Sequence, residues 1–195
     1  MIYVQIPTGN RTRAAVKVVN AWQKAGIPAN VYTWDDETYE ALKDKAELLE
    51  YGERQSFAKL QNYMAANTQW DAIICGADDL FPAGGCEKLL DIARENNGKA
   101  LWIDDRCNSA QPCHPVITRG WYEQHGPEIF DEGFVHNFCD TDLWRRLGHT
   151  FVKVEGVQFH HRHWLQDERK KDKIDRIAIA AWKRDEAYFR TKHGA

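Results

Sequence analysis

Three pairs of adjacent aspartates stand directly after apolar segments in the first half of the chain. They are Asp35-Asp36, Asp78-Asp79 and Asp104-Asp105. Carboxylate oxygens are the ligands that hard divalent cations prefer. In open α/β sheets, ligands bind beyond the carboxyl ends of the strands. If the apolar segments are strands, the three pairs predict a site for a divalent cation, or for a ligand that carries many hydroxyl groups.

Histidines are concentrated at one place in the last quarter of the chain. Three of the four residues from His160 to His163 are histidines, and they follow a segment that we expect to be a strand. Alternate side chains of a strand share a face, so His161 and His163 are expected to point the same way. A lone histidine is more often an ordinary surface residue, but this spacing favours a binding role.

The elements that must position these residues alternate along the first half of the chain. Apolar runs that end at Gly, Pro or Asp predict strands near residues 2–6, 30–34, 70–75 and 99–103. Helical patterns lie between them, at about 13–24, at about 56–66, and from Pro82 to about Asn96. This alternation predicts an α/β domain with a mainly parallel central sheet flanked by helices.

The second half of the chain is less regular. We expect a strand at 114–119, a short helix at 140–147, a strand within 149–163, and one or two charged helices from Gln166 onward. An apolar stripe on the last segment is formed by Ile174, Ile177, Ala178 and Trp182. Residues 1–164 are therefore expected to form one domain, with residues 165–195 as a C-terminal helical extension packed on it. Within the domain, the regular half and the irregular aromatic half suggest two sides of a group-transfer site. The side that binds the group donor would be about 1–105, and the side that binds the acceptor about 106–164.

Composition excludes several classes of protein. No apolar stretch approaches about 18 residues, so we expect no membrane span, and the N-terminal segment lacks the features of a signal peptide. The five cysteines are an odd number and form no CxxC pair, so free thiols in a reducing cytoplasm fit better than a disulfide framework or a zinc ribbon.

Charge is distributed unevenly along the chain. The net charge is −3, but the segment from His160 to Ala195 carries ten lysines and arginines against six aspartates and glutamates. Such a basic C-terminal segment could bind the phosphate backbone of a nucleic acid. A solvated helix with mixed charges is the simpler interpretation.

At residues 2–164 the sequence resembles the GT-A glycosyltransferases, particularly the inverting family 2 type and its compact phage-like members. The segment Ile6 to Arg11 is similar to the first strand and turn of that family, commonly IPTYNR, and Asp35-Asp36 stands where the family has an acidic pair. The interval from Asn62 to Asp71 also matches the family. The resemblance implies that the nucleotide of a sugar donor contacts these residues: Pro7, Thr8, Asn10, Arg11, Asp35 and Asp36.

The segment Ile74 to Pro82 resembles the DxDD-type stretch of the same family, in which an aspartate binds a divalent ion that bridges two phosphates. The resemblance implies that Asp78 and Asp79 bind the donor and Mn²⁺ or Mg²⁺. Gly76 replaces the family's first aspartate, which contacts ribose. A turn that caps the next helix is the alternative interpretation of the aspartate pair.

Similar enzymes place a histidine after their last core strand as a further metal ligand. The resemblance therefore implies that His161 is a metal ligand, that His163 is a second ligand or a phosphate donor, and that Arg162 pairs with the diphosphate.

The segments Phe130 to Phe134 and Cys139 to Leu147 resemble the family's "FDE-F…EDxDLxxRL" stretch, with Cys139 in place of the glutamate. The resemblance implies that Asp140 is the catalytic base. Burial near Phe138 and Trp144 would increase its basicity. A capping role for Asp140 is compatible with this assignment.

Weaker candidates complete the site. Lys59 could contact the donor, although a solvent-facing lysine is the simpler interpretation. Four aromatic residues could stack on a sugar or base on the acceptor side, with core packing as the default for at least two of them: Trp102, Trp121, Tyr122 and Trp164.

The resemblance implies a metal-dependent enzyme that moves a sugar, with inversion, from a nucleotide-sugar (by family habit a UDP-sugar) to an acceptor hydroxyl. A 5-hydroxymethylpyrimidine in phage DNA is one candidate acceptor, and the host cytoplasm would then be the location. A saccharide-directed transferase, a nucleotidyltransferase, and a non-catalytic module that binds nucleotide-sugar or nucleic acid stay open as alternatives.

Overall fold

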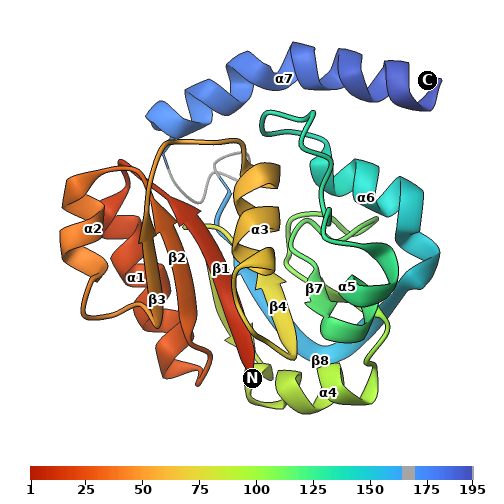
Figure 1. The fold of residues 1–195 in the computed structure, drawn as a ribbon, viewed down its shortest axis with the longest axis horizontal. Coiled ribbons are helices and arrows are strands. Elements are labelled where there is room, and N and C mark those ends of the chain that lie inside the picture. The colour runs from red at the N-terminus through yellow and green to blue at the C-terminus, as the bar shows by residue number, and fades with distance from the viewer. Residues whose placement is uncertain (164–169, 195) are drawn as a thin grey trace.

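The computed structural model describes residues 1–163 and 170–194, and it contains one eight-stranded sheet with helices on both faces (Figure 1). The strand order is β3-β2-β1-β4-β7-β6-β8-β5. Trp164 and the start of the predicted C-terminal extension lie outside the described residues.

The strands of the described chain are β1 (Ile2–Thr8), β2 (Ala29–Thr33), β3 (Leu48–Tyr51), β4 (Ala72–Cys75), β5 (Leu80–Gly84), β6 (Ala100–Asp104), β7 (Val116–Thr118) and β8 (Phe151–His161). The α-helices are α1 (Thr12–Lys24), α2 (Asp36–Leu42), α3 (Phe57–Ala66), α4 (Leu89–Glu95), α5 (Arg119–His125), α6 (Cys139–Leu147) and α7 (Lys173–His193). Short 3₁₀ turns, η1 (Cys86–Lys88) and η2 (Gly148–Thr150), precede α4 and β8.

The sheet is parallel in its first half and mixed in its second. Strands β3, β2, β1 and β4 run parallel. Strand β7 is antiparallel to both β4 and β6, β8 is parallel to β6, and β5 closes the edge antiparallel to β8. The expected α/β fold with a mainly parallel sheet is confirmed, and the carboxyl ends of β1, β2 and β4 lie at one edge.

Alternation along β4 separates the core into two layers. Ile74 packs with β1 and the apolar face of α1, which includes the fully buried Trp22. Ile73 and Cys75 pack on the opposite face, against residues of α3, α5 and α6 such as Trp121. A sheet covered on both faces explains why these strands are continuous apolar runs.

One expected element is wrong. The segment that begins at Pro82 was expected to open a helix, but Leu80–Gly84 forms β5, which pairs with β8 so that Leu80 lies opposite His161. Helix α4 starts only at Leu89. Proline and glycine resemble a helix start locally, whereas pairing with a distant strand decides the conformation here.

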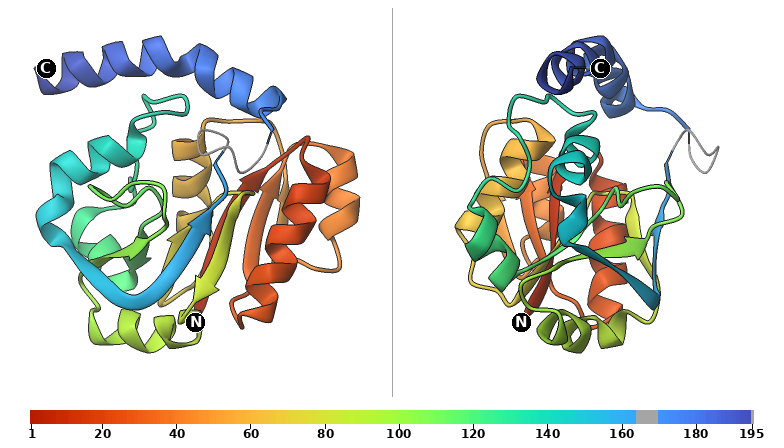
Figure 2. Two further views of the ribbon diagram at one scale, coloured as in Figure 1. Left: turned by 180° about the vertical axis from the view of Figure 1, so that it is seen from behind. Right: turned by 90° about the vertical axis from the view of Figure 1, so that its right-hand side faces the viewer.

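Helix α7 lies across the carboxyl edge of the sheet, from above α1 and α2 to above α6 (Figures 1 and 2). The predicted apolar stripe is only partly covered, since Ala178 is buried while Trp182 is 47% exposed. Within residues 1–163 and 170–194, no helix combines the length and the apolar character that a membrane span requires.

Candidate active site

The central contact of the candidate site joins the turn after β4 to the end of β8. Asp79 Oδ1 lies 3.2 Å from Nε2 of His161, and the backbone N–H of Arg162 donates to the carbonyl of Asp79 at 2.9 Å. The antiparallel pairing of β5 with β8 brings the two segments together. A carboxylate oxygen and an imidazole nitrogen that face each other are a suitable pair of ligands for one divalent cation.

Asp78, although adjacent in sequence, faces other partners. Its carboxylate accepts hydrogen bonds from Thr8 Oγ1 at 2.7 Å and from Arg11 Nη1 at 2.8 Å. Burial raises the pKa of Asp78, and the Arg11 guanidinium opposes this shift. Through these hydrogen bonds, Asp78 connects the turn after β4 to the end of β1 and the turn that follows it.

Arg11 also connects this turn to helix α7. Its guanidinium donates to both carboxylate oxygens of Asp172, at 2.7 and 2.8 Å, and to Asp175 at 2.9 Å. Asp172 is the N-cap of α7, and Asp175 completes its capping box. The predicted nucleotide-binding turn is thus covered by the start of the C-terminal helix.

The remaining donor-side residues surround the same turn. Asn10, in a left-handed conformation with φ 60°, donates its backbone N–H to Asp35 Oδ2 at 2.6 Å. Burial would raise the pKa of Asp35, but the hydrogen bonds from Asn10 and Thr38 lower it. Gly9 packs against the ring of Trp34, where an added Cβ would lie only 2.3 Å from ring atoms. Asp35 therefore stabilises the turn after β1.

Other donor-side predictions lie further from these contacts. Pro7 is within β1, opposite Tyr32. Asp36 is exposed and interacts with the hydroxyl of Tyr51. Lys59 is exposed on the first turn of α3.

Asp140 lies in the first turn of α6, partly exposed yet surrounded by protein. Gln111 Nε2 donates to its Oδ2 at 3.3 Å. Burial raises the pKa of Asp140, while hydrogen bonds from the Thr141 backbone and Cys113 oppose the shift. A carboxylate with a raised pKa is a stronger base than an exposed one.

Two thiols connect Asp140 to the Asp79–His161 pair. Cys113 interacts with both Asp140 and Cys107, its single S–H being available to one acceptor at a time, and Cys107 interacts with His161. The interaction with Cys113 and, to a smaller extent, the hydrogen bond and positive charge of His161 lower the pKa of Cys107. Asp140 and the Asp79–His161 pair are therefore linked through these two thiols.

Asp105 organises the loop that carries both thiols. Its carboxylate accepts the backbone N–H groups of Cys107 at 2.9 Å and Cys113 at 3.2 Å, and its carbonyl accepts the N–H of His161 at 3.0 Å. The sequence placed the pair that contains Asp105 among the carboxylates expected to bind a cation or a hydroxyl-rich ligand, but it gave Asp105 no individual role. The sequence feature that could have identified Asp105 is its position directly after a strand.

His161 has a raised pKa in this cluster. Burial would lower it, but hydrogen bonds to Asp79 and Cys107 raise it to about 10. His114, which sequence reasoning did not assign to the site, lies on the other side of the ring, with Nε2 3.2 Å from Nδ1 of His161. His163 also approaches His161, with ring centroids 5.1 Å apart, and Arg162 lies over the ring of Phe81 at 4.4 Å.

Asp79 and His161 are candidate ligands of a cation, but they do not make up a complete set of ligands. Among the described residues, no three His, Cys, Asp or Glu side chains are arranged to hold a metal ion by themselves. Asp79 and His161 supply one oxygen and one nitrogen, which leaves positions for phosphate oxygens and water. Asp78 and His163, also predicted as ligands, are not in this contact.

Two acceptor-side aromatic residues are displaced from the predicted site. Trp121 is 1% exposed and donates its Nε1–H to Thr150 at 2.7 Å, so it belongs to the core. Tyr122 packs against Trp70 at the amino edge of the sheet. The acceptor-side interpretation of these two residues is wrong, because β7 runs antiparallel to β4 and delivers α5 to the opposite edge.

Trp102 is partly exposed on β6 and packs edge-on against Trp144 of α6, with ring centroids 5.2 Å apart. It therefore contacts the helix that carries Asp140. Trp164, the fourth aromatic candidate, lies outside the described residues.

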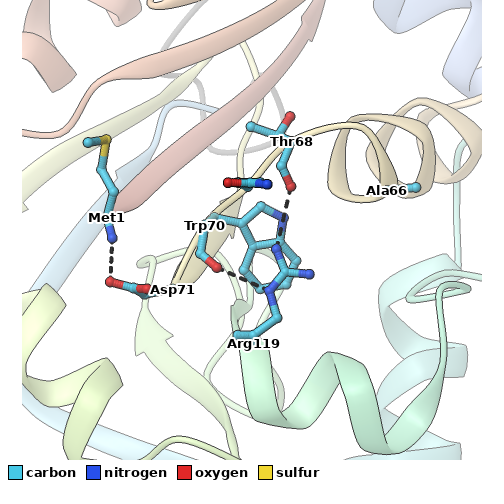
Figure 3. A pocket seen from close by; sticks show the side chains of 7 residues that line it. Met1, Ala66, Thr68, Trp70, Asp71 and Arg119 are labelled. Atoms are coloured by element: carbon cyan, nitrogen blue, oxygen red, sulfur yellow. Dashed lines mark hydrogen bonds and ion pairs between the residues drawn. The ribbon is translucent and has the colours of Figure 1, made fainter.

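A pocket of about 580 Å³ lies at the amino edge, around Trp70 and Arg119 (Figure 3). Arg119 stacks over the Trp70 ring at 3.7 Å, and the N-terminal amine pairs with Asp71. No residue predicted for chemistry lines this pocket. The candidate site is at the carboxyl edge, where its polar side chains converge.

Solved structures with a similar fold include the mannosyltransferase PcManGT from Pyrobaculum calidifontis, in complex with GDP-Man and Mn²⁺ (TM-score 0.59, 14% identity, 82% of this chain and 56% of that chain). TarS 1–349 from S. aureus is also similar (TM-score 0.57, 13% identity, 82% of this chain and 59% of that chain). A cytidylyltransferase from Leptospira borgpetersenii matches less closely (TM-score 0.51, 11% identity, 78% and 75%). The chain has the GT-A fold, and it spans little more than half the length of the first two proteins.

Sequence comparison gives one relative, a DNA polymerase of Bacillus phage SP02, which is 28% identical over 136 residues. The match covers 65% of this chain and 20% of the polymerase. No protein-family model matches the chain.

Proposed function

We propose that this GT-A chain is a metal-dependent, inverting glycosyltransferase that uses a nucleotide-sugar, with Asp140 as its catalytic base. The observation that carries the proposal is the Asp79–His161 contact at the carboxyl edge, connected to Asp140 through Cys107 and Cys113. Fold neighbours of the transferase type, one of them solved with GDP-Man and Mn²⁺, support it.

On the donor side, the turn at Thr8 to Arg11 and the carboxylate of Asp35 receive the nucleoside, with UDP as the proposed carrier. Asp79 and His161 would hold Mn²⁺ or Mg²⁺. When bound, the cation offsets the negative charge that develops on the departing nucleoside diphosphate.

On the acceptor side, Asp140 accepts the proton of a hydroxyl group while that oxygen attacks the anomeric carbon on the face opposite the leaving group. Burial in the surrounding protein raises the pKa of Asp140, which makes its carboxylate a stronger base. Proximity of base and cation within one cluster allows both groups to act on one reacting centre.

We propose that the acceptor is DNA that carries a 5-hydroxymethylpyrimidine. Helix α7 presents exposed basic residues and turns two of its three acidic residues, Asp175 and Asp185, inward. The outward cations are Lys173, Arg176, Lys183, Arg184 and Arg190. Such a row suits a phosphate backbone, and the likeness to part of a phage DNA polymerase is consistent with it.

The first test replaces Asp140 with Asn and measures sugar transfer and binding of UDP with Mn²⁺. Loss of a general base lowers turnover about 10²–10⁴-fold, whereas binding of UDP should stay within about twofold because Asp140 does not contact the proposed nucleotide site. Full activity in Asp140→Asn would refute the base assignment.

Assay of the products separates this proposal from its alternatives. A glycosyltransferase releases UDP from a UDP-sugar. A nucleotidyltransferase, favoured by the cytidylyltransferase likeness, would release pyrophosphate from a nucleoside triphosphate and a sugar phosphate. Duplex DNA and free saccharides, supplied in parallel as acceptors, distinguish the two acceptor classes. A pure binding module would show neither product.

A further inference from the structure

His114 is buried between the end of β4 and the end of β8. It is 5% exposed, and its two ring nitrogens have different partners. Nδ1 lies 2.9 Å from the carbonyl oxygen of Cys75, and Nε2 lies 3.2 Å from Nδ1 of His161. The two rings meet edge-on, with centroids 4.4 Å apart.

The carbonyl fixes the positions of the protons in this chain of contacts. A carbonyl oxygen only accepts, so Nδ1 of His114 carries a hydrogen. A neutral imidazole has one N–H, and Nε2 of His114 is therefore an acceptor. Nδ1 of His161 must then be the donor, whether His161 is neutral or charged. The neutral form of His161 consequently has its lone pair on Nε2, the atom that faces Asp79.

We propose that His114 is a positioning residue that holds His161 in the tautomer with a proton on Nδ1, so that Nε2 is free to bind the divalent cation beside Asp79. The inference rests on the metal site of the proposed function. Histidine ligands commonly donate their second ring N–H to an oxygen acceptor that orients them. Here the acceptor is a second imidazole, that of His114, and His114 in turn donates its own N–H to the backbone carbonyl of Cys75.

The arrangement ties both ligands to the same strand end. The carbonyl that orients His114 belongs to Cys75, the last residue of β4, and Asp79 follows four residues later on the same turn. Movement of this turn would therefore displace the carboxylate ligand and the support of the imidazole ligand together.

Binding of Mn²⁺ in the presence of UDP, followed by electron paramagnetic resonance, tests the inference without measuring turnover. His114→Leu keeps the bulk and removes both hydrogen bonds, and we expect its dissociation constant for Mn²⁺ to rise about 10–100-fold. His114→Gln can still accept from His161 and donate to Cys75, and it should restore most of the affinity. His149→Leu, at an exposed histidine, is the matched control and should bind as the wild type does.

A second readout uses the unmodified protein, so it stands even if His114→Leu fails to fold. In ¹⁵N-histidine spectra recorded with Mg²⁺ and UDP, His161, assigned by comparison with His161→Ala, should carry its proton on Nδ1 alone, whereas without the cation the Asp79 carboxylate also keeps a proton on Nε2. A proton on Nε2 and none on Nδ1 in the presence of Mg²⁺ and UDP would overturn the inference. If His161→Ala abolishes Mn²⁺ binding but His114→Leu does not weaken it, the inference fails while the metal site stands. If the wild type binds no Mn²⁺, the metal site and the inference fail together.

Discussion

Asp78 and Asp79 show how neighbouring residues of one type acquire different surroundings. Both were predicted to bind the donor and its cation. Asp79 faces His161, whereas Asp78 is occupied by Thr8 and Arg11. We therefore propose that Asp79 is the metal ligand of the pair and that Asp78 supports the nucleotide-binding turn.

Gly76, which stands in place of the aspartate found in similar enzymes, has no space for a side chain. A Cβ at this position would lie 2.6 Å from Cγ2 of Val4 and 3.0 Å from the carbonyl oxygen of Gln5. Restoring the aspartate by Gly76→Asp should destabilise the fold by about 1–3 kcal/mol, because β1 and β4 would have to separate. Urea unfolding followed by circular dichroism measures the change.

Gly84→Ala is the matched control for that prediction. A Cβ at Gly84 would meet no atom within 4 Å, so the free energy of unfolding should change by less than about 0.5 kcal/mol. Equal stability of the Gly76→Asp variant and the wild type would show that the packing of Gly76 is not restrictive.

At the scale of elements, helix α7 holds the loop that leads to Asp140. Asp185 is fully buried and accepts the backbone N–H groups of Val135, His136 and Asn137 at 2.9, 3.0 and 2.7 Å. The next residue, Phe138, has φ 65° and is the N-cap of α6. A carboxylate that accepts three N–H groups can maintain this unfavourable backbone conformation.

Replacement of Asp185 by Asn should lower the free energy of unfolding by about 2–4 kcal/mol, because one oxygen acceptor becomes an amide donor that faces N–H groups. Transfer activity should fall as well, since the loop positions Asp140. The control is Glu186→Gln, which removes an exposed ion pair to Arg190 and should change stability by less than about 0.5 kcal/mol. Chemical denaturation of both variants gives the comparison, and similar effects would argue against a special role for Asp185.

At the scale of the whole molecule, α7 is fastened to the domain at both ends and in the middle. Arg11 binds its start, Asp185 anchors its centre, and Asp142 of α6 receives its end. Asp142 is fully buried and accepts from Arg146 at 2.7 Å and from Lys192 and His193 at 2.8 Å each. Helix α7 is thus held against the turn after β1, the loop before α6 and α6 itself.

Asp142 should make stability depend on pH. Burial alone would raise its pKa, but the hydrogen bonds from Lys192, Arg146 and His193 lower it below the ordinary value. A lowered pKa in the folded state stabilises the protein above the pKa of the unfolded chain, and this contribution is lost as the pH falls through the folded value. Asp142→Asn should therefore cost about 3 kcal/mol at pH 7, and the difference from wild type should shrink below about pH 4.

Unfolding by urea across this pH range checks the prediction. Glu40→Gln, at an exposed pair with Lys43, serves as the control and should show little effect at any pH. A constant difference between wild type and Asp142→Asn from pH 7 to pH 3 would contradict the proposed charge interaction.

The sequence by itself determined the fold class and most of the elements. Strands such as Ile2–Thr8 and helices such as Thr12–Lys24 follow from local apolar patterns, and the aspartates were correctly placed after strands. Periodicity and turn residues are properties of short segments, so they can be read without tertiary information. The position of Asp140 at the start of a helix was predicted for the same reason.

Only the tertiary structure decided which residues meet. Strand β5 forms because β8, about 70 residues later, offers it an edge, and the same pairing brings His161 to Asp79. His114 and Cys107 reach the site through the antiparallel course of β7 and the loop held by Asp105, while Trp121 is carried into the core. Long-range pairing and burial depend on the whole packed chain, and local sequence patterns do not encode which distant side chains become neighbours.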